Sequence, residues 1–150
     1  WLPKAMAAPT PVSCLVHSST LVTAGVMLMD YVYVSLNSDV LSFVFYVGFF
    51  TVVFSGFCAS VEEDAKKIVA LSTVIQIGFS FLAIGSGLHY LSYVHMISHS
   101  FFKSLLFMQM GYLIFINFGQ QDYRGYSFLS FMSYSFFCPY FVCVVCCLLG

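Results

Sequence analysis

Residues 89–118 of the chain read HYLSYVHMISHSFFKSLLFMQMGYLIFINF. This stretch is long and apolar enough to cross a membrane as one helix, because a span needs about 20 residues. It nevertheless contains His95, His99 and Lys103 at steps of four residues, which places all three on one face of a helix. Ionisable groups are costly to bury in a membrane, so they face the protein interior and tend to serve ion or proton transfer. We therefore expect a membrane helix with a proton path along one face.

The composition of the whole chain agrees with a membrane protein. Of its 150 residues, 61% are hydrophobic and only 7% are charged, whereas about a quarter of the residues in a soluble domain are charged. The mean hydropathy is +0.95. The net charge of −1 gives no electrostatic reason to expect nucleic acid as a partner. Because the chain begins without Met and ends inside an apolar run, we expect an internal piece of a longer polypeptide.

The apolar segments and the breaks between them predict an all-α, polytopic membrane helix bundle of about five transmembrane helices. A charged run at 62–67 and a polar run at 119–125 form two of the breaks. Gly85 and Gly87 divide a charge-free stretch that is too long for a single span. No linker separates domains, so we expect all the spans to belong to one bundle. The predicted spans are 11–29, 40–60, 68–87, 89–118 and 126–150.

The charges between the spans predict how the bundle is oriented. Five alternating spans place the basic residues outside the helices on one side of the membrane, and these residues are Lys4, Lys66, Lys67 and Arg124. The opposite side holds Asp30 and Asp39 but neither Lys nor Arg. The positive-inside rule then places the Lys4 end on the cytoplasmic or matrix side. The charged run most simply forms a solvated loop, and it offers the i, i+4 pairs Glu62–Lys66 and Glu63–Lys67.

Two other predicted spans each carry a polar face that could hold water. The members of these faces are Ser13, His17 and Thr20 in the first span and Thr73, Gln76 and Ser80 in the third, with Lys66 near the same face at its entrance. Together with the His95–Lys103 face they could enclose a water-containing channel. The remaining faces suit lipid or helix packing, for example at Phe43, Phe49, Phe50 and Phe54.

Simpler interpretations of these polar residues stay open. Ser and Thr often only join membrane helices by hydrogen bonds, and His17 could be a packing residue. Lys103 could extend to the membrane interface, although its place near the middle of the span argues against this. His95 and His99 have the spacing of two metal ligands, but Met96 stands where the HExxH motif has Glu, and Lys103 would repel a cation. His17 and His99 could instead hold haem b between two helices.

Three motifs point to a known family. They are WLPKAMAAPTPVS at 1–13 with LVHSSTLVTAG at 15–25, DAKKIVALST at 64–73 with QIG at 76–78, and HMISHSFFKSLLF at 95–107. These motifs resemble the signature of the chain 5 family of NADH-ubiquinone oxidoreductase, the distal antiporter-like subunit of respiratory complex I. The match spans about residues 1–119, and the tail from Gln120 resembles the family only in being another apolar span.

The resemblance implies redox-driven proton pumping by a subunit of proton-translocating NADH:ubiquinone reductase in the mitochondrial inner membrane, with the Lys4 end on the matrix side. It implies that Lys103 is the central protonatable lysine and that His95 and His99 continue a hydrated axis. The residue that matches His17 lies on a neighbouring helix of that axis. The residues that match Asp64 and Lys66 lie toward the matrix-side entrance.

The resemblance also implies what surrounds this segment. No metal and no cofactor are expected in it, because NADH, FMN, the iron–sulfur clusters and ubiquinone belong to other subunits. The expected partners are the other membrane-arm subunits, the lipid bilayer, protons and internal waters. Family elements on either side of the chain are missing, so we do not expect the piece to pump alone. The main alternative is a subunit of a multisubunit cation/proton antiporter, followed by a cytochrome and a purely structural subunit.

Overall fold

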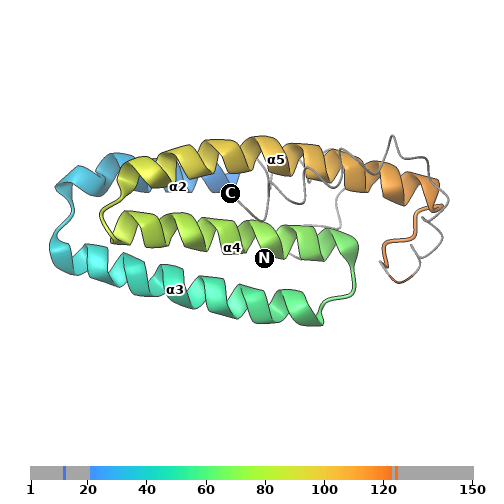
Figure 1. The fold of residues 1–150 in the computed structure, drawn as a ribbon, viewed down its shortest axis with the longest axis horizontal. Coiled ribbons are helices and arrows are strands. Elements are labelled where there is room, and N and C mark those ends of the chain that lie inside the picture. The colour runs from blue at the N-terminus through green and yellow to red at the C-terminus, as the bar shows by residue number, and fades with distance from the viewer. Residues whose placement is uncertain (1–11, 13–20, 123, 125–150) are drawn as a thin grey trace.

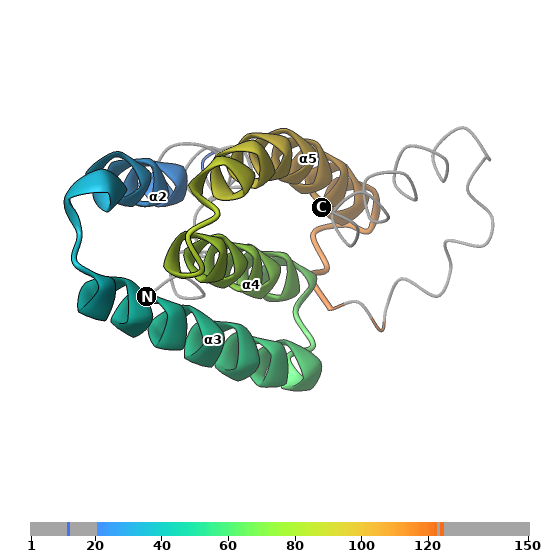
Figure 2. The same cartoon turned by 60° about the vertical axis from the view of Figure 1, so that its left-hand side comes forward.

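The computed structural model describes residues 12, 21–122 and 124. Within them the chain forms α2 (Leu21–Val32), a 3-10 turn η3 (Tyr33–Ser35), α3 (Ser38–Val61), α4 (Ala65–Gly85) and α5 (His89–Ile116). The helices lie side by side along their lengths (Figure 1). Figure 2 shows α4 in the middle, with α3 on one side and α2 and α5 on the other. The predicted all-α helix bundle is confirmed over the described residues.

The helix ends differ from the predicted spans at several points. By length and hydropathy, α3 and α4 could each cross a membrane. Helix α4 begins at Ala65 instead of 68, and α5 ends at Ile116 instead of 118. Helix α2 continues beyond the predicted end at 29 and therefore contains Asp30. One carboxylate does not interrupt helical backbone hydrogen bonding, so α2 runs on to Val32. The predicted span 126–150 lies outside the described residues.

The connection between α4 and α5 lies where the two glycines predicted a break. Gly85 is the last residue of α4, and Gly87 has a φ of +86°, which favours glycine. The N–H of Gly87 donates to the carbonyl of Ile84 at 3.0 Å, and the N–H of Leu88 donates to that of Ala83 at 2.9 Å. This pair of bonds is the Schellman motif, which ends a helix and satisfies its last carbonyls. The turn sends α5 back along α4.

Helices α3 and α4 approach each other closely through glycines. A Cβ atom added to Gly78 would lie 2.6 Å from Thr51 Oγ1, and one added to Gly85 would lie 2.7 Å from the Cα atom of Phe45. Small residues at such positions let membrane helices pack backbone to backbone. The outer face of α3 instead carries exposed Phe43, Phe49, Phe50 and Phe54, as expected for a surface that contacts lipid or another helix.

The loop between α3 and α4 contacts the segment that follows α5. Asp64 and Asp122 form an isolated antiparallel bridge, and the N–H of Ala65 donates to the carbonyl of Gln121 at 3.1 Å. The Arg124 guanidinium forms an ion pair with the Glu63 carboxylate. The two loops that the alternating arrangement placed on one side therefore lie at the same end of the bundle.

Candidate functional site

Lys103 is among the largest of the fully buried side chains in the described residues, with 1% of its surface exposed. Its Nζ atom donates to the carbonyl of Val69 at 3.3 Å and also to Ser72 Oγ. The Ser72 hydroxyl donates in turn to the same Val69 carbonyl at 2.7 Å. The side-chain nitrogen is thus buried against one turn of α4 and does not extend to an exposed position. Hydrogen bonds of this kind offset the cost of burying a charged group.

The two histidines continue the same face of α5. The rings of His95 and His99 are stacked with their centroids 6.3 Å apart and their planes 8° apart, as the i, i+4 spacing allows. His95 is buried, and its ring lies 5.3 Å from that of Phe79 on α4. The Nε2 atom of His99 is buried and has no hydrogen-bond partner among the described residues. Because the ring spacing exceeds hydrogen-bond distance, a proton passing between them needs a bridging water.

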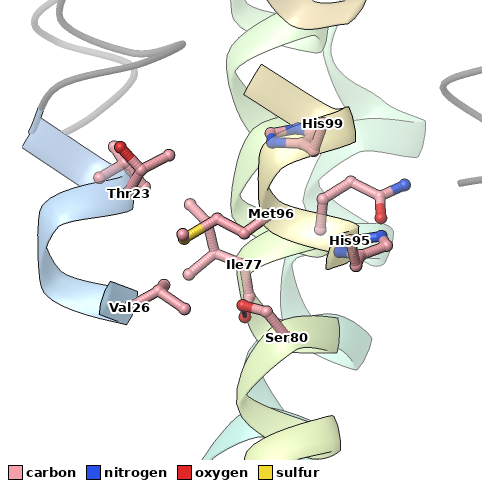
Figure 3. Close-up of a pocket in the computed structure, with 9 residues that line it drawn as sticks. Thr23, Val26, Ile77, Ser80, His95, Met96 and His99 are labelled. Atoms are coloured by element: carbon pink, nitrogen blue, oxygen red, sulfur yellow. Dashed lines mark hydrogen bonds between the residues drawn. The ribbon is translucent and has the colours of Figure 1, made fainter. Parts of the chain in front are cut away.

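A small cavity lies beside the histidines, between α2, α4 and α5 (Figure 3). Its enclosed part has room for about one water molecule. It is lined by Val22, Thr23, Val26, Gln76, Ile77, Ser80, His95, Met96 and His99. Figure 3 shows Thr23 and Val26 on α2 across the cavity from Met96 and His99 on α5. The structure therefore brings Gln76 and Ser80 of the predicted α4 face next to His95 and His99, with Thr23 of α2 across from them.

The predicted polar face of α4 follows the same line. Thr73 and Ser80 are fully or almost fully buried, and Lys66 is buried at the beginning of the helix. Since α4 and α5 are joined by a tight turn and run antiparallel, Lys66 lies at the end of the line that continues through Lys103. The hydroxyls of Thr73 and Ser80 donate to carbonyls within their own helix, those of Ala70 and Ile77. Their oxygen atoms can still accept a hydrogen bond from water.

Asp64 lies in the loop just before α4. Its carboxylate is 2.5 Å from Lys67 Nζ, and the same nitrogen is 3.8 Å from Glu62. The hydrogen bond from Lys67 holds the pKa of Asp64 below its usual value of 3.8, partly opposed by desolvation. The predicted pairs Glu62–Lys66 and Glu63–Lys67 are wrong, because residues 62–64 precede the helix and lack its i, i+4 geometry. Lys67 pairs with Asp64 and Glu62 instead, and Glu63 pairs with Arg124.

Of the predicted site residues, Lys103, His99, His95 and Lys66 lie along one line between α4 and α5, and Asp64 lies at the adjoining loop. His17 and the rest of its polar face, Ser13 and Thr20, lie outside the described residues. Residue patterns alone missed Thr23, although it continues that face three residues after Thr20. In the part of the chain that the structure describes, no three His, Cys, Asp or Glu side chains gather as metal ligands.

Comparison with known proteins adds a family to this geometry. The sequence model described as "NADH:quinone oxidoreductase/Mrp antiporter, TM" matches residues 1–150. NADH-ubiquinone oxidoreductase chain 5 of Ascaris suum is 58% identical over 89% of this chain and 25% of its own length. Chain 5 of Caenorhabditis elegans is 58% identical over 85% and 24%. NADH-quinone oxidoreductase subunit L of Pseudomonas aeruginosa is 47% identical over 76% and 19%. The chain thus spans about a quarter or less of the length of these relatives.

Proposed function

The chain belongs to the transmembrane family of NADH:quinone oxidoreductases and Mrp antiporters, and on that basis we propose that it is a segment of the proton-pumping membrane arm of an NADH:ubiquinone oxidoreductase. It acts within a proton-translocating enzyme, while electrons pass from NADH to ubiquinone elsewhere in the complex. The observation that carries this proposal is the burial of Lys103 in line with His99 and His95. A buried ionisable group in a membrane helix is costly and serves a function by default.

The contacts of Lys103 suggest how it holds a proton. Val69 offers a carbonyl oxygen, which can only accept a hydrogen bond. The Ser72 hydroxyl already donates its hydrogen to Val69, so it too meets Nζ as an acceptor. Two acceptors suit an ammonium group, which has three hydrogens to donate. When a water molecule competes for these contacts, Lys103 gives up a proton, and the water transfers that proton to His99. Lys103 then receives a new proton from the Lys66 end of the line.

The orientation proposal places the Lys66 end on the matrix side of the mitochondrial inner membrane, together with the Lys4 end. It is supported by the contact between the loop just before Lys67 and the segment that carries Arg124, because basic segments near the helix ends remain on that side. Asp64 and Lys66 then stand at the entrance, and protons move from there toward Lys103. His17 is proposed to extend the path on a neighbouring helix.

The surroundings of the segment form part of the same proposal. NADH, FMN, the iron–sulfur clusters and ubiquinone are bound by other subunits, and this segment moves protons without redox chemistry of its own. Its partners are the other membrane-arm subunits, internal waters and the lipid bilayer. The exposed aromatic face of α3 supports contact with lipid or with a neighbouring subunit.

A cation/proton antiporter subunit is the second candidate, because the family description covers Mrp antiporters as well. The names of the relatives favour the oxidoreductase, since chain 5 relatives reach 58% identity. Sodium-dependent proton exchange in vesicles, without any oxidation of NADH, would favour the antiporter instead.

The test replaces Lys103 by Met in the full parent chain, within the assembled complex in sealed vesicles. Lys103→Met should lower the number of protons pumped per NADH oxidised, because Met cannot bind a proton. The matched control is Leu105→Met, at an exposed position of the same helix, and it should pump as the wild type does. Native gels confirm that each variant assembles. An unchanged proton stoichiometry in an assembled Lys103→Met complex would refute the proposal.

A further inference from the structure

Two buried oxygen atoms lie on α2 and α5 outside the line described above. Asp30 Oδ1 and Ser92 Oγ are both buried, and neither has a hydrogen-bond partner among the described residues. The Ser92 side chain is 0% exposed. Buried oxygen atoms without a partner are rare, because no hydrogen bond offsets the free energy lost when water is removed from them. Both atoms therefore need an explanation that the line from Lys103 to His95 does not supply.

The packing of α2 against α5 places these two residues opposite each other. Val26 and Met96 share one core cluster, and the Tyr33 ring stacks on His89 with centroids 5.1 Å apart. Tyr33 follows Val26 by seven residues, whereas His89 precedes Met96 by seven, so the two segments run antiparallel with one register. Asp30 follows Val26 by four residues, and Ser92 precedes Met96 by four. They share a level and a face, since residues four and seven apart lie on one side of a helix.

The same register links this level to the cavity. Thr23 precedes Val26 by three residues, and His99 follows Met96 by three. Both line the cavity, and Figure 3 shows them together above Val26 and Met96. Between the Thr23–His99 level and the Asp30–Ser92 level lie Val26 and Met96, which form one apolar cluster with Ile84. Beyond Asp30 lies the exposed His89, beside Gly87 and the loop end of α5.

We propose that Asp30 and Ser92 form a proton-exchange site through which the His95–His99 cavity communicates with the Gly87 side of the membrane. This inference rests on the proposed function. The Asp30 carboxylate accepts one proton, by way of water, from a protonated histidine of the cavity and becomes a neutral carboxylic acid. The histidine becomes neutral in the same step. The acid then donates its proton to water hydrogen-bonded to Ser92 and exposed near His89, which restores the carboxylate.

Asp30 forms no ion pair with another described residue that would explain its position as a structural one. Among the described residues no Lys, Arg or His lies within ion-pair distance of its carboxylate, since the ion pairs there involve Glu62, Glu63 and Asp64. The titratable groups that flank it in the α2–α5 register are Tyr33 and His89, one turn nearer the Gly87 end. A carboxylate inside an apolar helix, opposite a buried hydroxyl, can exchange a proton if water reaches it.

The test uses the full parent chain in its assembled complex in sealed vesicles. Asp30→Asn keeps the shape of the side chain but cannot bind a proton, and it should lower the number of protons pumped per NADH oxidised toward the value of Lys103→Met. Asp30→Glu should restore most of the loss, because it keeps the carboxyl group. The matched control is Asp39→Asn, at an exposed position of the first turn of α3, which should pump as the wild type does.

The outcomes separate this inference from the proposed function. If Asp30→Asn pumps normally while Lys103→Met does not, the exchange site is refuted and the proposed function stands. If both variants pump normally, the proposed function is refuted as well. If the complex with Asp30→Asn does not assemble, Ser92→Ala tests the exchange site instead, because it removes the Ser92 hydroxyl and leaves the Asp30 carboxylate in place. The same loss of pumped protons is expected, and a wild-type proton stoichiometry would overturn the inference.

Discussion

At the scale of single residues, the surroundings of Lys103 depend on the backbone of α4 as much as on side chains. The nitrogen of Lys103 contacts the Val69 carbonyl, and Ser72 links that carbonyl to the nitrogen by a second route. A hydrogen bond to a charged group contributes about 1.5–3 kcal/mol to stability. The hydroxyl of Ser72 thus helps to hold the side chain of Lys103 in place.

Ser72→Ala tests this arrangement. The substitution removes one of the hydrogen-bond acceptors of Lys103 and should lower the free energy of unfolding by about 1.5–3 kcal/mol. The number of protons pumped per NADH oxidised should also fall. Ser42→Ala is the matched control, because that hydroxyl is exposed and donates only to the Ser38 carbonyl of its own helix. Its effect should stay within about 0.5 kcal/mol. Equal melting curves for the two variants would contradict the role given to Ser72.

The pair of Asp64 and Lys67 predicts a pH dependence of the loop contact. Because the pKa of Asp64 is lowered in the folded chain, its stabilising effect is complete above the ordinary value of 3.8 and is lost as the pH falls below it. Lys67→Gln should speed hydrogen exchange of the Ala65 amide at neutral pH by no more than about fivefold, since an exposed ion pair adds little to stability. The exchange rates of variant and wild type should converge below pH 3.8. A difference that persists there would assign the effect to another contact.

At the scale of helices, the contact between α3 and α4 depends on the absence of side chains. A Cβ atom on Gly85 would lie 2.7 Å from the Phe45 backbone, which cannot move without shifting α3. Gly56 lies on the same pair of helices, but a Cβ there would meet nothing within 4 Å. The two glycines therefore differ in function although both are apolar helix positions in sequence.

Gly85→Ala should lower the free energy of unfolding by about 1–3 kcal/mol, the usual cost of inserting a methyl group into a packed site. Gly56→Ala should be neutral or stabilising by up to about 1 kcal/mol, because Ala favours helix formation over Gly. The two variants are compared by heating the assembled complex and measuring on native gels how much of it remains intact at each temperature. If both substitutions had the same effect, the close approach of α3 and α4 would not limit stability.

Helical periodicity explains which parts of the site were predictable. His95, His99 and Lys103 share a face because of local geometry alone, and the break at Gly87 follows from the conformation that glycine favours. The partners of Lys103 on α4 could not be predicted in the same way, because they depend on how far α5 slides along α4. The level shared by Asp30 and Ser92 likewise requires the register of α2 against α5. The pairing of Glu63 with Arg124 joins residues far apart in sequence, and local spacing suggested the wrong partner.

At the scale of the whole molecule, the contact between the loops divides the bundle into two ends. The residues around Asp64 and Asp122 lie at one end, whereas the turns at Asn37 and Gly87 lie at the other, since α3, α4 and α5 run along the bundle between these ends (Figure 1). The buried polar line starts at the first end with Lys66, and the Asp30–Ser92 level lies nearest the second. A path along these residues would therefore run the length of the bundle.

Labelling of single cysteines tests this division. A membrane-impermeant maleimide should modify Gln121→Cys only from the matrix side and Asn37→Cys only from the opposite side, because both positions are exposed at opposite ends. The unsubstituted chain gives the background from its natural cysteines, and intact and inverted vesicles give access to each side. Modification of both variants from the same side would contradict the alternating arrangement, and a reversed pattern would contradict the matrix-side placement alone.

The apolar cluster of Val26, Ile84 and Met96 has an electrical consequence. In an energised membrane, hydrated regions conduct, so most of the voltage falls across whatever stays dry between them. Each 100 mV that falls on such a layer changes the energy of one crossing elementary charge by about 2.3 kcal/mol. These three side chains then insulate the cavity from the Asp30–Ser92 level except while the bridging water of the proposed proton exchange is in place. A polar residue in place of one of these three would keep water there permanently. Protons would then leak across the membrane and lower the membrane potential, while the chain remained folded.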